Sequence, residues 1–592
     1  MLPRSVDLAA PLRVRWLGRV PYDEALALQR GLFEHGREQH LLLLEHPPVY
    51  TLGVRASTDN VLADPADVGA ELVRTDRGGD VTYHGPGQLV GYPVLSLPSK
   101  RGSGGGLADT VAYVRTVEQV LIDALSDLGL PRAGRVRAFP GVWLDPDSDR
   151  PRKVAAVGVR LSRGRTMHGF ALNVTTDLSM FGHIIPCGIV GKAVTSLEAE
   201  GLRVTMREVI DAVSARAATT WGGGVLERQD VAWRHRPSDL SAFSRGEGAG
   251  TVVRDASQHL QGRLEQAGVV GGLQIATRKP EWLRPKVHHG PEVLALKRSV
   301  RELGLVTVCE EAGCPNLSDC WADGTATFMV LGERCTRACG FCLVDTRKPG
   351  VVDETEPERV AEAVDSLALD HAVLTMVARD DLADGGLALV AETVLAIRRR
   401  RPQAVVETLI SDAKGDASSL DVLFDVRPDV LNHNVETVAR LQRAVRPSAG
   451  YARSLGVLAR AKAAGLTTKS GLILGMGETE DEVLGALVDL SGVGVDIVTL
   501  GQYLRPTPKH APLDRYVTPE GFASFERAGY DLGFSFVASG PLVRSSYHAA
   551  EGFVAARVKP AKAPESSGVL PELPPAPARG PDLIPLQALV RR

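Results

Sequence analysis

Hydrophobic residues are spaced in two different ways along the chain, and the change falls near its middle. Between residues 39 and 224, short apolar runs follow one another closely in "HLLLLEHPPVYTLG", "DVTYHGPGQLVGYPVLSL" and "KVAAVGVRLSRGRTMHGFALNV". These runs predict strands, the last of them a pair joined at residues 162–165. One helical face is predicted from Val111, Val114, Val117, Leu121 and Leu125. Strands without intervening helices favour an α+β domain around a largely antiparallel sheet.

From about residue 276 to residue 555, strand-like runs alternate with helical patterns. The strands are predicted at "HAVLTMV", "QAVVETLI", "DVLNHN", "TTKSGLILGM", "VDIVTLGQYL" and "FSFVASG", and helices at "GLALVAETVLAIRRRR" and "EDEVLGALVDL". This alternation predicts a parallel sheet with right-handed crossovers, closed or nearly closed like a TIM barrel. We expect the chemistry at the carboxyl ends of its strands.

The length of 592 residues is too great for one compact domain. We expect a first domain at residues 1–235, a polar linker with some helix at 236–275, a second domain at 276–555 and a disordered Pro-rich tail at 556–592. With 68 Lys+Arg against 71 Asp+Glu, the net charge of -3 gives no case for nucleic acid or an anionic membrane as partner. No apolar run approaches the roughly 18 to 20 residues that cross a bilayer, so we expect a cytoplasmic protein.

Six of the seven cysteines lie between residues 309 and 342, which indicates a metal or catalytic site rather than a disulfide framework. In "GERCTRACGFC", the thiols of Cys335, Cys339 and Cys342 follow the strand-like "ATFMVLG". Three such thiolates can hold three irons of a [4Fe-4S] cluster and leave the fourth iron for an exogenous ligand. A structural zinc site is the alternative, but the following "LVDTRKPG" offers no Cys or His as fourth ligand.

A second triplet precedes the first, in "CEEAGCPNLSDC". Cys309, Cys314 and Cys320 also supply three ligands to a cluster that has four corners. The spacing alone leaves the fourth ligand open.

Both triplets together resemble lipoyl synthase, a radical S-adenosylmethionine (SAM) family, over about residues 276–555. Further matches are "NHNVETV", "VRPSAGYARSLGVL", "KSGLILGMGETEDEV", "YLRPTPKHAPLDRYVTPEGF" and "VRSSYHA". The resemblance implies a partial TIM barrel of the radical SAM type, with a SAM-binding [4Fe-4S] cluster on Cys335, Cys339 and Cys342. Reductive cleavage of SAM then yields a 5'-deoxyadenosyl radical, with electrons from a donor such as ferredoxin or flavodoxin.

The resemblance also implies a ligand for the open corner of the auxiliary [4Fe-4S] cluster on Cys309, Cys314 and Cys320. The first serine of "RSSY", Ser545, is expected to hold it, with Ser546 as the fallback. An alkoxide matches cluster iron less well than a thiolate, so this corner should open readily. The cluster is then consumed as it donates sulfur to carbons 6 and 8 of a protein-bound octanoyl chain.

Four positions depart from the family pattern. Met376 and Ala378 stand where Ser and Asp are expected, and Ser411 and Ala413 where Pro and Phe are usual. None of them is an expected cluster ligand, but they lie where the barrel edge should position substrate.

The seventh cysteine, Cys187, lies in the apolar "IIPCGIV", where an inert core thiol is the simplest interpretation. The glycine-rich "RGGDVTYHGPGQLVGYP" nevertheless suits a loop that wraps a substrate, and "RKVAAVGVR" supplies Lys153. Since a nearby ammonium group favours the reactive thiolate, Cys187 and Lys153 can form a catalytic dyad.

These segments, with "HGFALNV" and "IIPCGI" followed by "VTSL", resemble octanoyltransferase over about residues 13–224. The resemblance implies a fold of the biotin/lipoate transferase-ligase type. It implies that Cys187 takes octanoyl from acyl carrier protein as a thioester, and that Lys153 manages protons when the target lysine attacks. The acyl site is expected to be lined by Arg77, Gly78, Gly79, Asp80, Val81, Thr82, Tyr83, His84, Ala156, Val157, Gly158, Gly169, Phe170 and Ala171. His84 and His168 are expected as supporting residues.

The chain is therefore predicted to be a bifunctional fusion that octanoylates and then lipoylates lipoyl domains of 2-oxoacid dehydrogenases and the glycine-cleavage H protein. One alternative is an ATP-dependent lipoate or biotin ligase as the front half, but no strand-loop-helix phosphate motif surrounds the "RGSGGG" at residues 101–106. Another is a non-catalytic, zinc-stabilised protein that binds acylated carriers.

Overall fold

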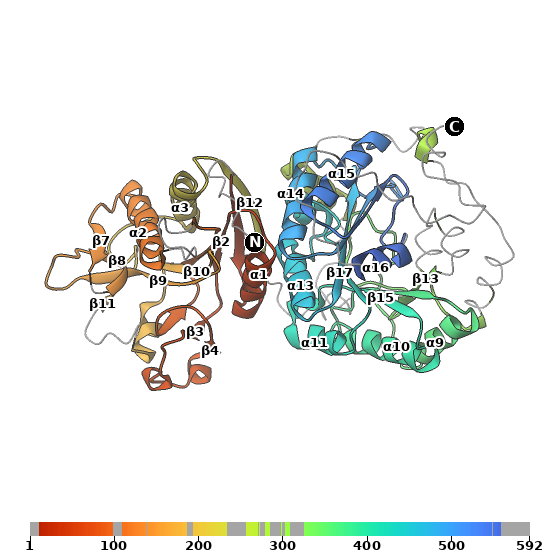
Figure 1. The fold of residues 1–592 in the computed structure, drawn as a ribbon, viewed down its shortest axis with the longest axis horizontal. Coiled ribbons are helices and arrows are strands. Elements are labelled where there is room, and N and C mark those ends of the chain that lie inside the picture. Colours follow the sequence, from red (N-terminus) through yellow and green to blue (C-terminus); the bar gives the residue numbers. More distant parts are fainter. Residues whose placement is uncertain are drawn as a thin grey trace, which may run out of the picture. The chain divides into compact units, whose positions relative to one another are not determined.

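The computed structural model describes residues 11–98, 109–137, 139–185, 193–233, 256–269, 272, 279–283, 298, 302–307, 316, 325–547 and 549–557. Two compact units are formed, one mainly from Met1–Ser238 and the other mainly from Asp239–Arg592. Figure 1 shows the first in red to yellow and the second in green to blue. Each unit is described by itself.

The first unit is built on a nine-stranded mixed sheet with the order β12-β1-β2-β6-β10-β9-β8-β7, and β11 pairs with β9. Only the pairings of β1 with β2 and β12, and of β11 with β9, are parallel, which confirms the predicted largely antiparallel sheet. A second sheet has the order β4-β3-β5. The strands are β1 (Leu12–Arg19), β2 (His40–Glu45), β3 (Val49–Leu52), β4 (Glu71–Arg74), β5 (Val81–His84), β6 (Gln88–Val94), β7 (Ala133–Val136), β8 (Phe139–Leu144), β9 (Arg152–Ser162), β10 (Arg165–Asn173), β11 (Ala193–Val194) and β12 (Leu226–Trp233).

Helices of the first unit are α1 (Tyr22–Glu34), α2 (Thr110–Asp127) and α3 (Met206–Trp221). The apolar faces of α2 and α3 pack with the sheet into one hydrophobic core (Figure 1). Val117, Leu121 and Leu125 are buried there, as their spacing predicts, and Val114 is partly buried. Val111 differs, because it lies in the first turn of α2 and is 63% exposed.

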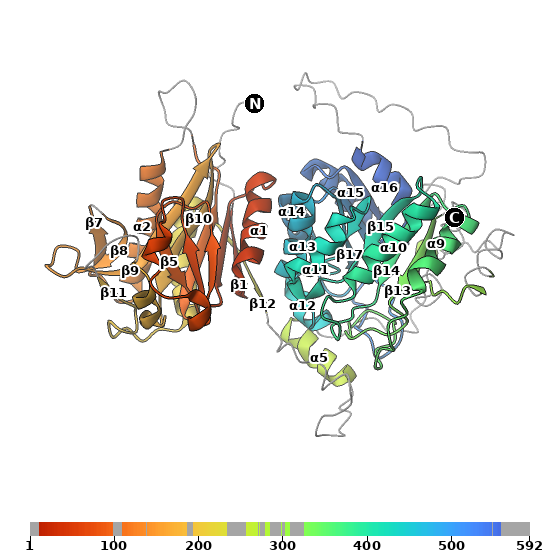
Figure 2. The same cartoon turned by 90° about the horizontal axis from the view of Figure 1, so that it is seen from below.

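The second unit contains seven strands that are all parallel and neighbour one another in chain order, from β13 to β19. An open path of parallel strands with helices outside it is a partial TIM barrel, as predicted (Figure 2). The strands are β13 (Thr325–Val330), β14 (His371–Met376), β15 (Val405–Leu409), β16 (Val430–Asn432), β17 (Thr467–Leu474), β18 (Ile497–Gln502) and β19 (Phe536–Gly540). The helices are α9 (Glu356–Ser366), α10 (Leu387–Arg400), α11 (Ala417–Asp425), α12 (Ala439–Val445), α13 (Tyr451–Ala463), α14 (Glu480–Gly492), α15 (Pro519–Leu532) and α16 (Ala549–Arg557).

A further helix, α5 (Ala256–Gln266), falls within the segment predicted as linker. Its Leu260 and Leu264 are 6% and 2% exposed. Arg263 Nε donates to the carbonyl oxygen of Ala444 in α12 at 3.2 Å. A Cβ built on Gly340 would lie 3.0 Å from Leu260 Cδ1. Helix α5 therefore packs on the second unit, against the loop that carries Cys339 and Cys342.

The interior of the second unit contains a buried ion pair. Lys469 Nζ, on β17, lies 3.0 Å from Glu407 Oε2 on β15, and Asn432 Nδ2 donates to Glu407 Oε1 at 2.8 Å. Burial alone would raise the pKa of Glu407, but the Lys469 ammonium and its other partners lower it to about 2.

Within the part of the chain that the structure describes, no helix is long and apolar enough to cross a membrane.

Candidate active sites

Lys153 lies near the start of β9 and is 8% exposed. Its ammonium nitrogen lies 4.8 Å from the centre of the Trp143 ring on the paired strand β8. The register shifts between Val142, opposite Ala155, and Trp143, opposite Lys153. Such a bulge changes the direction of the side chains beside it. Strand β9 therefore holds the Lys153 side chain in a fixed place against the Trp143 ring.

Cys187 lies outside the described residues, but both flanks of its segment are fixed. On one side, the Ile185 amide donates to the carbonyl oxygen of Asn60 at 2.8 Å. On the other, β11 pairs with β9 in the register Ala193 opposite Arg152 and Val194 opposite Lys153. The chain that leaves Cys187 thus returns to the strand that carries Lys153.

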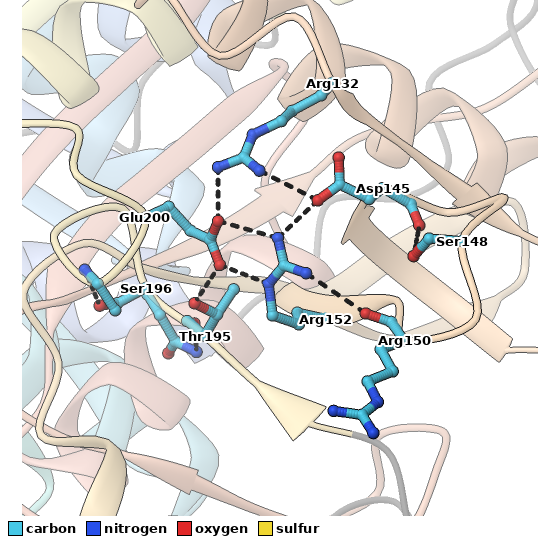
Figure 3. Close-up of polar contacts among 10 residues, drawn as sticks. Arg132, Asp145, Ser148, Arg150, Arg152, Thr195, Ser196 and Glu200 are labelled. Atoms are coloured by element: carbon cyan, nitrogen blue, oxygen red, sulfur yellow. Dashed lines mark hydrogen bonds and ion pairs between the residues drawn. The ribbon is translucent and has the colours of Figure 1, made fainter.

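Ion pairs fasten this junction (Figure 3). Glu200 accepts from Arg152 Nε at 2.7 Å and from Arg132 Nη2 at 2.6 Å, and Thr195 Oγ1 donates to it at 2.8 Å. Asp145 completes the group by pairing with both arginines. The hydrogen bond from Arg152 holds the pKa of Glu200 below its usual value, so the carboxylate stays charged.

The predicted acyl-site segments come together in the fold. Gly169 lies opposite Gly158 in the β10–β9 pair, and Phe170 and Ala171 lie opposite Val157 and Ala156. The Gly78 amide donates to the Val159 carbonyl oxygen at 3.0 Å, and a Cβ on Gly158 would lie 2.9 Å from the Gly78 oxygen. Glycine at this position allows the backbones to approach closely. Asp80 accepts from Asn60 Nδ2 at 2.7 Å, and Val81, Thr82, Tyr83 and His84 form β5.

A directed chain of hydrogen bonds starts at buried Arg77, whose guanidinium donates to Thr51 Oγ1 at 2.8 Å. The Thr51 hydroxyl lies 3.3 Å from His84 Nε2, and His84 Nδ1 lies 2.8 Å from Gln88 Oε1. Gln88 Nε2 donates to Asn173 Oδ1 at 2.9 Å, which makes its Oε1 an acceptor and His84 Nδ1 the donor. Burial lowers the pKa of His84 well below its usual value, so the ring is neutral.

Two further histidines lie beside this chain. His46 Nδ1 lies 2.7 Å from the Val20 carbonyl oxygen and its Nε2 2.8 Å from the Tyr92 hydroxyl, and burial lowers its pKa to about 4. His168 Nε2 lies 2.7 Å from Asp76 Oδ1. Burial lowers the pKa of His168 although Asp76 opposes the shift. The predicted acyl-site region thus contains neutral imidazoles packed near the buried Arg77.

In the second unit, the thiols of Cys335, Cys339 and Cys342 lie on the loop after β13 and are partly exposed. Burial nevertheless raises the pKa of all three, that of Cys342 to about 12. The Cys335 sulfur accepts from the amides of Arg337 at 3.4 Å and Ala378 at 3.3 Å. The two amide donors on the Cys335 sulfur fit a thiolate, the form in which cysteine binds cluster iron.

A buried arginine anchors this loop to two strand ends. Arg337 donates to both oxygens of Asp380, after β14, at 2.8 and 2.7 Å, and to Asp412, after β15, at 2.6 Å. Burial would lower the pKa of Arg337, but the two carboxylates raise it well above its usual value. The loop is therefore held to the carboxyl edge of the sheet by buried ion pairs.

The auxiliary triplet, Cys309, Cys314 and Cys320, lies outside the described residues, but Asn316 between its members is described and buried. Asn316 Nδ2 donates to the Leu542 carbonyl oxygen at 2.6 Å. Ser545, three residues further along, accepts at Oγ from Asn434 Nδ2 at 2.7 Å. The fold thus brings Asn316 close to the serine segment. Across the described ranges, no three Cys, His, Asp or Glu side chains form a group for a single metal ion.

Each half of the chain matches a known protein family. Residues 21–218 match the family described as lipoyl protein ligase A/B catalytic domain, and residues 329–490 match the radical SAM superfamily. A lipoyl synthase of Mycobacterium sp. (strain KMS) is 50% identical over 325 residues, which are 55% of this chain and 98% of that protein. The chain belongs to the lipoyl synthase family. The lipoyl synthase of Rubrobacter xylanophilus is 53% identical over 275 residues, covering 46% of this chain and 86% of that protein.

Two solved structures resemble parts of the chain more distantly. Protein Ta0514 of T. acidophilum, titled a putative lipoate protein ligase, is 18% identical with a TM-score of 0.31, covering 38% of this chain and 89% of that chain. Methylornithine synthase is 14% identical with a TM-score of 0.30, covering 48% and 85%. The family assignment rests on the sequence matches.

The four departures from the lipoyl synthase pattern lie at the barrel edge. Ala378 contributes through its backbone, because its amide bonds the Cys335 sulfur and its carbonyl accepts from the Thr336 amide at 2.9 Å. Ala413 has a φ of 42°, in the left-handed region, and Ser411 Oγ accepts from its amide at 3.3 Å. Met376 ends β14. These contacts place no departing side chain on an expected cluster ligand.

Several polar residues of both sites are not predicted from the sequence. In the first unit these are the buried His46, Thr51 and Tyr92 and the partly exposed Asp76, and in the second the buried Arg337, Asp380, Asp412, Asn434, Lys469 and Glu407. A signal existed for Asp380 and Asp412, because each follows a predicted strand, where parallel sheets place their chemistry. Arg337 lies inside the cysteine motif itself.

Proposed function

We propose that the chain carries out two consecutive steps of lipoyl cofactor synthesis on one carrier protein. The first unit transfers an octanoyl group from octanoyl-acyl carrier protein to a lysine of a lipoyl domain, and the second inserts two sulfur atoms at carbons 6 and 8. The observation that carries the proposal is the presence, in one chain, of a ligase A/B catalytic domain and a lipoyl synthase. The product of the first reaction is then the substrate of the second.

In the first step, the Cys187 thiolate attacks the carrier thioester, a new thioester forms on Cys187, and the carrier leaves as a thiol after taking a proton from the Lys153 ammonium group. In the second, the amine of the target lysine attacks this thioester, an amide forms and the Cys187 thiolate is released. Lys153, held over Trp143, accepts the proton that the amine loses. The exchange of one thioester for another has a free-energy change near zero, and formation of the amide from a thioester is favourable. No ATP is therefore needed.

The second unit supplies ligands for two [4Fe-4S] clusters in this proposal. Cys335, Cys339 and Cys342 would hold the SAM-binding cluster, and Cys309, Cys314, Cys320 and Ser545 the auxiliary one. When bound, the clusters and SAM supply radical chemistry and the sulfur atoms. The chain itself anchors the loop of Cys335, Cys339 and Cys342 through Arg337, and Asn316, which lies within the second triplet in the sequence, contacts Leu542 near Ser545.

The test is an anaerobic assay with octanoyl-acyl carrier protein, an apo lipoyl domain, SAM and a reductant, read by intact mass. We expect octanoylation without ATP, followed by gain of two sulfur atoms. Iron analysis should give roughly eight irons per chain, two full cubanes. Zinc without sulfide would overturn the second half of the proposal.

An ATP-dependent ligase remains the other candidate for the first unit, because the matching family includes lipoyl protein ligase A. It predicts octanoylation from free octanoate and ATP, with no acyl group on the cysteine. Octanoate trapped on Cys187 by mass spectrometry, and lost in Cys187→Ser, would favour the transferase.

A further inference from the structure

Asn434 connects the barrel wall with the serine segment. It lies two residues after β16, at the carboxyl edge of the parallel sheet, and is 5% exposed. Its side-chain nitrogen donates to Ser545 Oγ at 2.7 Å. This is a direct contact between the buried amide and the serine oxygen that the proposed function makes a cluster ligand.

The position of Asn434 is fixed on several sides. Its carbonyl oxygen accepts from Arg446 Nη1 at 3.0 Å. Its side chain also hydrogen-bonds the carboxyl group of Glu436, which opposes the rise in pKa that burial causes there. The amide of Asn434 thus faces Ser545 through its nitrogen rather than its oxygen.

The opposite edge of the amide lies against a glycine. A Cβ on Gly471 of β17 would lie 3.0 Å from Asn434 Oδ1 and 2.5 Å from Thr499 Oγ1. Only a residue without a side chain leaves this room at the barrel wall. Asn434 Oδ1 has no hydrogen-bond partner among the described residues, so the amide is held by its nitrogen.

The serine segment approaches the barrel just as closely. A Cβ on Gly501 of β18 would lie 2.1 Å from the carbonyl oxygen of Val543. The Val543 amide donates to Gly540 at 3.1 Å, and the Tyr547 amide donates to Arg544 at 2.9 Å. Ser545 therefore sits in a turn whose backbone is fixed on both sides, and its side-chain oxygen meets Asn434.

We propose that Asn434 is a positioning residue for Ser545, and that its N–H holds the serine oxygen and stabilises the negative charge that this oxygen carries as an iron ligand. This inference rests on the proposed role of Ser545. A hydrogen bond to a charged oxygen is stronger than one to a neutral hydroxyl.

The test uses full-length protein in which Cys335, Cys339 and Cys342 are replaced by alanine, so that only the auxiliary cluster can assemble. Four forms are compared in this background: the parent, Asn434→Asp, Ser545→Cys and the double variant. The readouts are iron per chain, the rate of iron release to a chelator and the electron paramagnetic resonance spectrum of the reduced cluster. None of these depends on turnover.

Asn434→Asp keeps the size of the side chain but replaces the donor by an acceptor. We expect iron release about tenfold faster than in the parent, the scale of a lost hydrogen bond to a charged oxygen, together with a changed spectrum. With Ser545→Cys the ligand is a thiolate that needs no such donor, so Asn434→Asp should then change release less than twofold. This coupling is what a purely structural role of Asn434 would not produce.

Two controls keep the outcomes separate. Asn432→Ala removes a buried amide of the same strand that bonds Glu407 instead of Ser545, and should leave the spectrum unchanged. If Ser545→Cys alters neither release nor spectrum, the serine is not a ligand and the proposed function fails at that point. Suppose that Ser545→Cys does change iron release or the spectrum. If Asn434→Asp then matches the parent, or changes the rate of iron release equally with and without Ser545→Cys, Asn434 does not position the ligand. Asn434→Ser repeats the test if the aspartate variant fails to fold.

Discussion

The two candidate sites differ in the polar groups that they bury. Around the predicted acyl site, neutral imidazoles and amides such as His46, His84 and Gln88 are buried together with Arg77. In the barrel, buried charged groups lie in direct contact, as in Arg337 with Asp380 and Glu407 with Lys469. Buried polar groups need partners in both cases, and the Lys469 ammonium keeps Glu407 charged down to a pH near 2.

The difference suits the chemistry proposed for each half. Acyl transfer passes through two neutral thioesters, and a neutral, hydrogen-bonded wall can fix an acyl chain without attracting water. The loop that binds a cluster has to stay in place while the charge of the metal changes. An ion pair with fixed geometry resists movement of the loop. The halves should therefore fail separately and under different conditions.

The largest expected effect comes from removing one reactive cysteine at a time. Cys187→Ser should lower octanoyl transfer by more than about a thousandfold, because a hydroxyl ionises far less readily than a thiol. The same variant should convert a lipoyl domain that already carries octanoyl at the parent rate. Cys339→Ala should do the reverse. Intact mass spectrometry follows both steps, and loss of both activities in either variant would contradict the independence of the halves.

Breaking the buried ion pairs of Arg337 should destabilise the barrel alone. Arg337→Met leaves the carboxylates of Asp380 and Asp412 buried without their cation, which costs about 3 to 5 kcal/mol. Arg399→Met is the matched control, since Arg399 pairs with Glu358 on the surface and its loss should cost less than about 1 kcal/mol. Denaturant unfolding of the metal-free chain, followed by hydrogen exchange in each unit, measures both. Equal losses in the two variants would show that burial adds nothing.

Mild acid should act on the first unit before the barrel. In the first unit, burial lowers the pKa of His46 to about 4, and it lowers the pKa of His84 and of His168 as well. In the barrel, burial lowers the pKa of His433 to about 4. Above pH 6.5 these rings are neutral whether the chain is folded or not. Between pH 6.5 and 4 the unfolded chain binds protons that the folded chain does not, so stability falls in this window.

His46 alone should cost the first unit about 3 kcal/mol at pH 4. Glu407, with a pKa near 2, keeps the barrel ion pair charged throughout this range. Hydrogen exchange at a series of pH values tests the order of unfolding. His46→Asn should make the first unit less sensitive to acid, and a barrel that opens first would refute the comparison.

The sequence predicts those features of the molecule that depend on one continuous segment of the chain. Alternating runs predict the β9–β10 pair, and the strand-helix alternation predicts the parallel order from β13 to β19. The cysteine motifs identify the cluster loops because spacing within a short loop limits which chemistry fits. Lys153 is predicted for the same reason, from the strand that carries it.

What the sequence does not show are partnerships between distant strand ends. Asp380 and Asp412 each follow a strand, but nothing local indicates that both meet Arg337. The contact of Asn434 with Ser545 joins residues 111 positions apart and depends on two glycines that let the backbones approach. Such contacts follow from the curvature of the sheet, which no local pattern encodes.

The smallest expected effect concerns α5, which separates the two halves in the sequence but packs on the barrel. Leu260→Asp places a charge in a buried contact beside Gly340 and should detach the helix at a cost of about 1 to 2 kcal/mol. Gln261→Asp, on the exposed side of the same helix, is the matched control. Hydrogen exchange should rise in α5 and at the Gly340 amide, which donates to the Val445 carbonyl oxygen at 2.7 Å, and stay unchanged in the first unit. If the first unit responded instead, α5 would belong to the acyl site's half, and the division between neutral and charged interiors would not coincide with the division of the chain.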